Sequence, residues 1–262
     1  MPLLTFRNVR ILALLLVLAY VALYSRHQLV LSRAWERPLA VTVFPINGDG
    51  LPATRDYIAS LDTDAFREID RWFADEGKRY GLEVAEPVYT ETGPQVDSTP
   101  PVLEKGAGPF ATLWWGLKMR YWAWQNTPDS RSNVARVRLF VIYHQGREGE
   151  ALPHSLGLQK GLIGVVHAFA ERRQARQNRI VIAHELLHTV GATDKYDARG
   201  LPVVPDGLAD PSRQPVYPQR RAEIMAGHIA VAPGRSTMAG GLSKVVINPY
   251  TALEINWIKA PD

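Results

Sequence analysis

The sequence predicts an α+β fold in which helices cover a twisted, mixed β-sheet. Three observations support this prediction. Apolar, β-branched segments alternate with amphipathic helical segments from residue 39 to residue 190. The last helical segment of this series carries the pattern H-E-x-x-H at residues 184 to 188. The chain beyond it is rich in Pro and Gly and shows little periodicity, so we expect a loop-rich C-terminal part.

The composition is that of a globular domain with a basic N-terminal extension. Of 262 residues, 46% are hydrophobic and 21% are charged, so the chain can bury a sizeable core. The absence of Cys excludes disulfides, thiolate metal sites and a Cys nucleophile. The net charge of +4 comes from residues 1 to 34, which hold Arg7, Arg10, Arg26 and Arg33 and no acid. Because the other basic and acidic residues balance, we expect no nucleic-acid partner.

The chain divides into an N-terminal segment, residues 1 to 34, and a domain, residues 35 to 262. Residues 11 to 25 are uncharged and almost all apolar. As a helix they are about 22 Å long, against a hydrocarbon core of about 30 Å, and flanking apolar residues and arginines can extend that length. We expect a retained single-span membrane anchor, because no small-x-small cleavage site follows. A cleaved signal peptide and a buried core helix are the alternatives.

The same segment sets the expected localisation. Basic residues before the apolar run favour a cytoplasmic N-terminus, which places the domain outside the cytoplasm. The membrane is then one partner of this chain. If the segment is a cleaved signal peptide, the domain is secreted or periplasmic.

The first half of the domain holds the first strands and the first helix. Residues 39 to 44 are apolar and β-branched and predict a buried strand, which Pro45 and the Asn-Gly-Asp-Gly run at residues 47 to 50 should end. Residues 63 to 80 have aromatic and aliphatic residues at helical spacing and predict an amphipathic helix. Residues 84 to 90 predict a short strand.

The following elements lead to the H-E-x-x-H helix. Residues 134 to 143 predict an interior strand, and the glycine-punctuated residues 156 to 169 an edge strand. Helices are predicted at residues 177 to 190 and 251 to 258. A further helix, residues 110 to 125, has a stripe that we expect to pack into the core: Phe110, Leu113, Trp114, Leu117, Tyr121 and Trp124.

Five residues around the H-E-x-x-H pattern have the chemistry of a metal-dependent hydrolase. His184 and His188 lie one helical turn apart, so both imidazoles can bind one Zn²⁺. Glu185 stands beside the first ligand, where its carboxylate can act on a water molecule. Gly191 permits a sharp turn, and Asp194 follows where a carboxylate can supply a third ligand.

The pattern H-E-x-x-H-x-x-G-x-x-D over residues 184 to 194 resembles that of the metzincin zinc peptidases, with Asp in place of the usual third His. This variant is similar to the snapalysins and to the immune inhibitor A peptidases, which also share the following Tyr196 and Asp197. The segment around Met225 resembles the metzincin methionine turn. The resemblance implies a mixed sheet whose edge strand binds extended substrate, and residues 156 to 169 take that place in the order.

The resemblance implies a zinc endopeptidase that acts on a peptide or protein substrate, with Glu185 as the general base. Glu223 is an alternative third ligand, as in the gluzincins, if the segment around it is helical. The tyrosine that many metzincins place two residues after the methionine is absent here. Tyr196 and His228 are the candidates for oxyanion or substrate contacts, and Tyr217 and Tyr250 are further tyrosines that can serve.

Two other functions are compatible with the sequence. One is a zinc hydrolase that acts on a non-peptide amide. The other is a non-catalytic, membrane-anchored interaction protein that retains the fold. The intact Glu185 favours an enzyme over an interaction protein.

Overall fold

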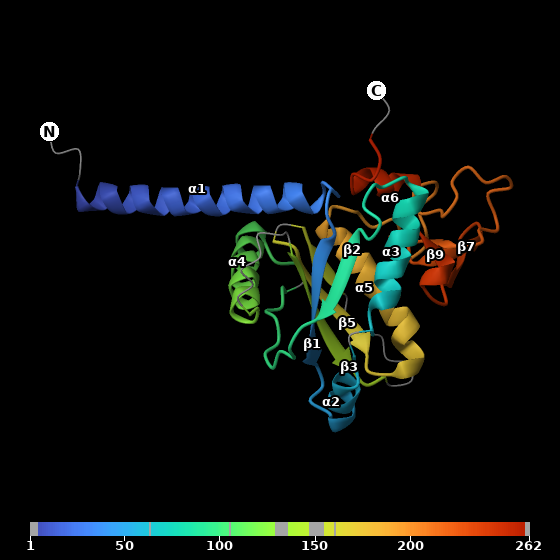
Figure 1. Ribbon diagram of the computed structural model, residues 1–262, viewed down its shortest axis with the longest axis horizontal. Coiled ribbons are helices and arrows are strands. Elements are labelled where there is room, and N and C mark those ends of the chain that lie inside the picture. The colour runs from blue at the N-terminus through green and yellow to red at the C-terminus, as the bar shows by residue number, and fades with distance from the viewer. Residues whose placement is uncertain are drawn as a thin grey trace.

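A five-stranded mixed sheet forms the centre of the domain in the computed structural model, which describes residues 5–62, 64–104, 106–128, 136–146, 155–159 and 161–259 (Figure 1). The strand order is β2-β1-β3-β5-β4. Neighbouring strands are parallel except β4, which is antiparallel to β5. The strands are β1 Leu39–Asn47, β2 Val88–Thr92, β3 Arg136–His144, β4 Leu156–Leu158 and β5 Ile163–Phe169. The mixed sheet with covering helices confirms the predicted combination of α and β structure.

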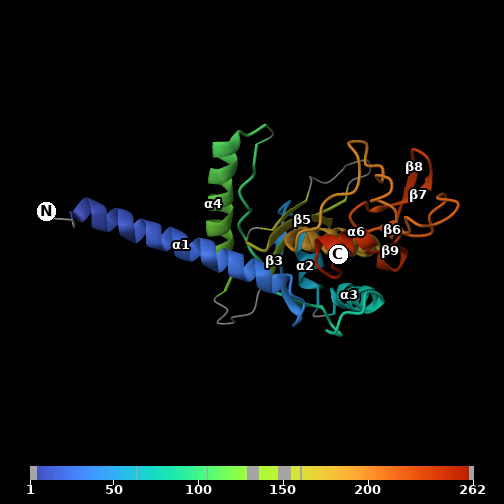
Figure 2. The same ribbon diagram turned by 90° about the horizontal axis from the view of Figure 1, so that it is seen from above.

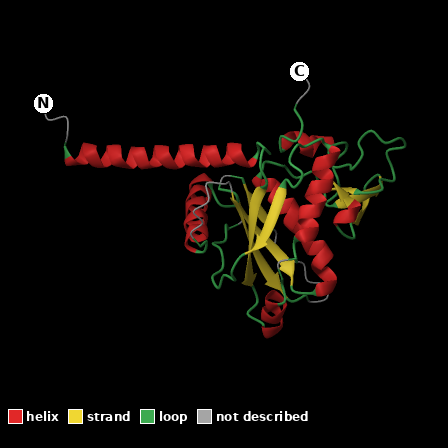
Figure 3. Cartoon of the chain, viewed as in Figure 1, coloured by secondary structure: helices red, strands yellow, loops and turns green. Residues whose placement is uncertain are grey.

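Helices cover both faces of this sheet (Figure 3). On one face, α3 (Arg67–Arg79) and α5 (Ala175–Thr189) close the larger hydrophobic core. On the other face, α4 (Pro109–Gln125) closes a smaller core. Because strand side chains alternate between the faces, β1 contributes Val43 to the larger core and Phe44 to the smaller one.

The first strand continues through the proline that was expected to end it. Pro45 pairs with Val141 inside β1, and the strand ends at Asn47. The Pro45 carbonyl accepts from the Val96 N–H at 2.9 Å, on the side of β1 that faces β2. Because the β2 pairing ends at Thr92, the N–H that Pro45 lacks falls beyond the end of that strand, and no sheet hydrogen bond is lost.

The glycine-rich segment predicted as one edge strand forms two strands. Short β4 is the sheet edge, and β5 lies between β3 and β4 in the sheet interior. Gly161 and Leu162 have positive φ values of 121° and 52°, which reverse the chain between the strands. The edge strand that was expected to bind substrate therefore corresponds to β4 alone.

Several short elements carry little periodicity and were not predicted, among them α2, which begins at Pro52, a residue favoured at the first helical position. Helix α3 begins at Arg67, whereas it was predicted to start at Thr63, which lies outside the described residues. Val134 and Ala135, the first two residues of the strand predicted at residues 134 to 143, also lie outside them. The remaining elements are α2 Pro52–Ala59, β6 Ala222–Glu223, β7 His228–Ala232, β8 Arg235–Met238, β9 Val245–Val246 and α6 Pro249–Glu254.

The N-terminal helix α1 (Phe6–Ser32) extends away from the domain (Figures 1 and 2). Its side chains are exposed from Phe6 to His27. It is long and apolar enough to cross a membrane, since an 18-residue stretch of it has a mean hydropathy of 1.9, and a signal sequence has the same properties. The domain holds the chain just after α1, because Trp35 Nε1 donates to the Ile255 carbonyl at 2.6 Å.

The apolar stripe of α4 is exposed, which contradicts the prediction that it packs into the core. Phe110 is 88% exposed and Trp124 is 65% exposed. The opposite side of the helix faces the sheet, where Met119 and Ala123 are fully buried. Both sides of α4 are apolar, so periodicity located the helix but did not decide which side faces the core.

Candidate metal centre

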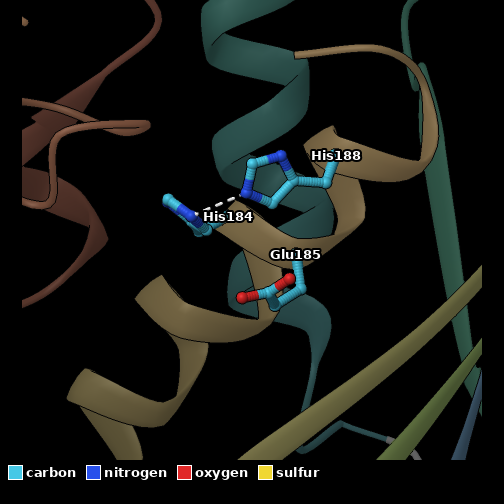
Figure 4. A group of neighbouring side chains, drawn as sticks. All are labelled: His184, Glu185 and His188. Atoms are coloured by element: carbon cyan, nitrogen blue, oxygen red, sulfur yellow. Dashed lines mark hydrogen bonds between the residues drawn. The ribbon is translucent and has the colours of Figure 1, made fainter. Parts of the chain in front are cut away.

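Helix α5 brings the two histidines of the H-E-x-x-H pattern together. The Nε2 atoms of His184 and His188 are 3.1 Å apart (Figure 4). The helix is held against the sheet by its apolar residues, of which Ile182, Leu186 and Leu187 are fully buried. Both imidazoles are consequently on the opposite, solvent-facing side, and their side chains are 14% and 17% exposed.

A third ligand atom completes a triangle with these two nitrogens. Asp194 Oδ1 lies 3.1 Å from each Nε2. Gly191, with φ of 109°, ends the helix in a conformation that side chains strongly disfavour, and the chain turns back toward the histidines. The structure thus brings His184, His188 and Asp194 together from a single segment.

Backbone carbonyls fix which imidazole nitrogen faces the triangle. His184 Nδ1 donates to the Ile224 carbonyl at 3.0 Å, and His188 Nδ1 donates to the Ala192 carbonyl at 2.9 Å. A carbonyl only accepts, so each Nδ1 carries the proton. The Nε2 lone pairs are therefore directed at the point between the three side chains, as metal ligation requires.

The spacing and charge of this triangle fit Zn²⁺. Tetrahedral Zn²⁺ with bonds of about 2.0–2.1 Å separates its ligand atoms by about 3.3 Å, close to the 3.1 Å found here. Burial opposes ionisation of Asp194, but its interactions with the two histidines outweigh burial and hold the pKa of this carboxyl below its usual range. Two imidazoles and one carboxylate form a donor set that zinc commonly uses.

Glu185 is buried beside the histidines, and one of its carboxylate oxygens is unpaired. The side chain is 5% exposed, and its ligand atom lies within 4.8 Å of those of His184 and His188. Its Oε2 has no hydrogen-bond partner among the described residues. Burial raises the pKa of Glu185, although the two histidines act in the opposite direction. A buried, unpaired carboxylate costs stability, which is typical of a functional site.

Strand β4 crosses the helix at this point, and a glycine permits the close contact. A Cβ on Gly157 would lie 2.4 Å from His188 Cβ and 2.7 Å from the Glu185 carbonyl oxygen. Any side chain there would therefore push the edge strand away from α5. No local pattern marks Gly157 as special, because its close contact is with a helix almost thirty residues later in the chain.

The methionine segment lies beneath the site and is not helical. Residues Ala222 and Glu223 form β6, and a turn through the fully buried Met225 follows. Glu223 is fully buried, accepts from the Ala226 N–H at 3.0 Å and from Thr251 Oγ1 at 2.7 Å, and has a pKa that burial raises to about 7. Its carboxylate thus holds the turn whose Ile224 carbonyl orients His184.

The remaining candidates take different places. The Tyr196 ring stacks on His184 with ring centroids 6.4 Å apart. His228 starts β7, and its Nδ1 is 3.4 Å from the Ala226 carbonyl oxygen, on its own turn. Tyr250 is on α6. Of these candidates, Tyr196 is the one whose ring contacts a histidine of the site.

A polar network that the sequence did not reveal holds the loop with Asp194. Glu254, on α6, accepts from the Thr193 N–H at 2.9 Å and from Thr193 Oγ1 at 2.6 Å. The same carboxylate forms a 2.8 Å ion pair with Lys195, whose side chain is 3% exposed. These contacts fix the residues on either side of Asp194. The paired positions are 59 and 61 residues apart, and no local pattern connects them, so this network could not be predicted from the sequence.

Glu254→Ala should weaken metal binding without removing a ligand. Zinc affinity is expected to fall about 10–100-fold, as for groups that support metal ligands. We expect a loss of about 2 kcal/mol in stability, less than for a fully buried pair because Glu254 is 29% exposed. Chelator competition and urea unfolding measure both quantities. Glu104→Ala, at an exposed glutamate, is the control, and equal zinc affinity in both variants would contradict the role of Glu254.

Comparison with known proteins returns no matching family model and no matching curated protein. The functional conclusion therefore depends on the residues and geometry of the site.

Proposed function

We propose that this chain is a zinc-dependent endopeptidase anchored to a membrane by α1. The observation that carries the proposal is the triangle of His184, His188 and Asp194 at mutual distances of 3.1 Å, with an unpaired Glu185 carboxylate oxygen beside it. This arrangement supplies three ligands, leaves one side of the site open and places a base next to it. The H-E-x-x-H-x-x-G-x-x-D pattern and the methionine turn support a metzincin-like peptidase.

Each residue of the site has a definite task in this reaction. His184, His188 and Asp194 would hold the metal. When bound there, Zn²⁺ supplies a Lewis acid that polarises the scissile carbonyl and lowers the pKa of water toward about 7. Glu185 accepts a proton from the attacking water and delivers it to the leaving amine. The raised pKa of Glu185, caused by burial, suits a group that both takes and returns a proton.

Tyr196 is suited to stabilise the developing oxyanion. Burial, the Asp194 charge and a hydrogen bond to Asp194 raise the pKa of Tyr196 to about 12, so its hydroxyl stays protonated at neutral pH. A protonated phenol can donate a hydrogen bond to negative charge that forms on the substrate. The ring is 41% exposed and stacks on His184, so the side chain adjoins both the ligands and solvent.

The sheet edge beside the site favours an extended peptide over a small amide. Strand β4 is the last strand in the sheet order and lies against α5 at Gly157. An edge strand offers unpaired backbone donors and acceptors, which an extended peptide can pair with. A small non-peptide amide would leave that edge unused.

Helix α1 sets the proposed location of the enzyme. Its exposed part, residues 6 to 27, is about 33 Å long at about 1.5 Å per residue and can cross a hydrocarbon core of about 30 Å. The basic residues Arg7 and Arg10 favour a cytoplasmic N-terminus, which puts the site outside the cytoplasm. Removal of the segment as a signal peptide would give a secreted or periplasmic enzyme.

A peptide-library cleavage assay tests the proposed function. The purified full-length chain is incubated with the library, and products are identified by mass spectrometry. We expect cleavage within peptides that stops on zinc chelation and returns when Zn²⁺ is added back. A chain that binds zinc stoichiometrically but cleaves no peptide would contradict the peptidase, and hydrolysis of simple acyl amides by the same sample would favour the non-peptide alternative.

A further inference from the structure

The outer side of α4 is a continuous apolar surface on the domain. Its members recur at helical spacing and are each between 49% and 88% exposed: Phe110, Leu113, Trp114, Leu117, Tyr121 and Trp124. A soluble protein rarely leaves a contiguous apolar patch of this kind uncovered, and such a patch marks an interaction surface. We refer to these six residues as the α4 stripe.

The other side of α4 is fixed against the sheet, so the stripe cannot rotate inward. Met119 and Ala123 are fully buried in the smaller core. The Trp122 ring meets the Phe140 ring with centroids 4.5 Å apart, and Trp115 Nε1 donates to the Pro101 carbonyl at 2.8 Å. These contacts hold the helix in one rotation. Whatever covers the stripe must therefore come from outside the described part of the domain.

The arrangement of α1 and α4 indicates what covers it. In two views related by a turn about the horizontal axis, α4 runs crosswise to α1 (Figures 1 and 2). The N-terminal part of α1 extends past α4 on one side, and the sheet, α3 and α5 lie on the other side. A bilayer crossed by α1 would then lie against the outer face of α4, with α4 along its surface.

The composition of α4 suits the boundary between lipid and water. Trp114, Tyr121 and Trp124 are the residue types enriched at that boundary, since their rings are apolar and each carries one polar group. Helix α4 contains Lys118 and Arg120 and no acidic residue, which favours anionic headgroups. The Lys118 ammonium lies 5.7 Å from the Trp114 ring centroid, so a positive charge borders the apolar face.

We propose that α4 lies on the bilayer surface with its stripe among the lipid headgroups and upper acyl chains, as a second attachment beside α1. A second attachment restricts tilting of the domain relative to the bilayer, which a single spanning helix permits. The catalytic centre is thereby held at a constant height above the membrane. This proposal rests on retention of α1 as a membrane span.

Site-directed fluorescence in vesicles tests the proposal, and the absence of Cys makes single labelling sites clean. The full chain is reconstituted in vesicles of phosphatidylcholine and phosphatidylglycerol and labelled with an environment-sensitive fluorophore at Leu117→Cys in the stripe. Leu16→Cys reports on α1, and Met238→Cys, at a 60% exposed residue of β8, is the matched control. Lipids with a quencher near the headgroup or in the middle of the acyl chain measure depth.

We expect the headgroup-level quencher to quench the Leu117→Cys probe several-fold more than the Met238→Cys probe. The mid-chain quencher should quench the Leu16→Cys probe several-fold more than the same control. Quenching at Leu16→Cys with Leu117→Cys equal to the control overturns the α4 proposal and leaves the anchor intact. The proposal is overturned in favour of a second copy if the Leu117→Cys probe is shielded from water but not quenched by lipid, and if that shielding increases with protein concentration. An unquenched Leu16→Cys probe overturns the span and this proposal together. Peptide cleavage by the same samples reports separately on the proposed catalytic function.

Discussion

Glu185→Gln should lower kcat/KM for peptide cleavage by about 10²–10⁴-fold, the usual contribution of a general acid–base group. The amide has nearly the shape of the carboxylate but cannot accept a proton from water. Bound zinc should stay at the wild-type stoichiometry, because the triangle of ligand atoms belongs to His184, His188 and Asp194. Steady-state kinetics and metal analysis of the same preparation measure the two effects.

The matched control for this variant is Glu91→Gln, which removes a carboxylate charge at the ion pair with Arg136 on the other side of the sheet. It should cleave at the wild-type rate. Two results would contradict the role of Glu185. An unchanged rate in Glu185→Gln would exclude it as the base, and loss of zinc would make it a ligand.

Asp194→Ala should lower zinc affinity more than about 100-fold, beyond the 10–100-fold typical of groups that only support ligands. The variant removes one corner of the triangle, at 3.1 Å from each Nε2. His184→Ala should have at least as large an effect. Competition with a chromogenic chelator gives the affinities, and circular dichroism shows whether each variant is folded.

The control in this series is Glu223→Gln, at the alternative third ligand. We expect it to keep zinc, because the Glu223 carboxylate binds the Thr251 hydroxyl and the backbone of its own turn. Full zinc retention by Asp194→Ala together with zinc loss by a folded Glu223→Gln would overturn the metzincin-like ligand set and favour the gluzincin one. Glu254→Ala, with its smaller expected loss, separates a ligand from a residue that positions one.

Local patterns located the main strands and helices well because each depends on residues close in sequence. The helix predicted at residues 177 to 190 is α5, and the strand predicted at residues 134 to 143 is β3 within the described residues. Errors arose where a neighbour in space decides the outcome. Pro45 stays in β1 because β2 has already ended, and the segment from residue 156 to 169 divides because Gly161 and Leu162 turn the chain.

The α4 stripe shows the same limit for burial. Helical spacing correctly grouped its residues on one side, since 3.6 residues per turn is a local property. The helix is apolar on both sides, and the shape of the sheet selected Met119 and Ala123 to face inward. The sequence therefore identified the stripe but not its exposure, and the exposure is what indicates a membrane contact.

The sequence by itself determined the central pair of histidines, the adjacent Glu185 and the turn at Gly191, because positions 184 to 191 lie within two helical turns and their geometry is local. Only the tertiary structure decided that Asp194 rather than Glu223 meets the imidazoles. It also revealed that Glu254 holds the Asp194 loop and that Ile224 orients His184. The contacts of Ile224 and Glu254 join segments 40 to 61 residues apart. Their formation depends on the packing of the whole domain, which no local spacing encodes.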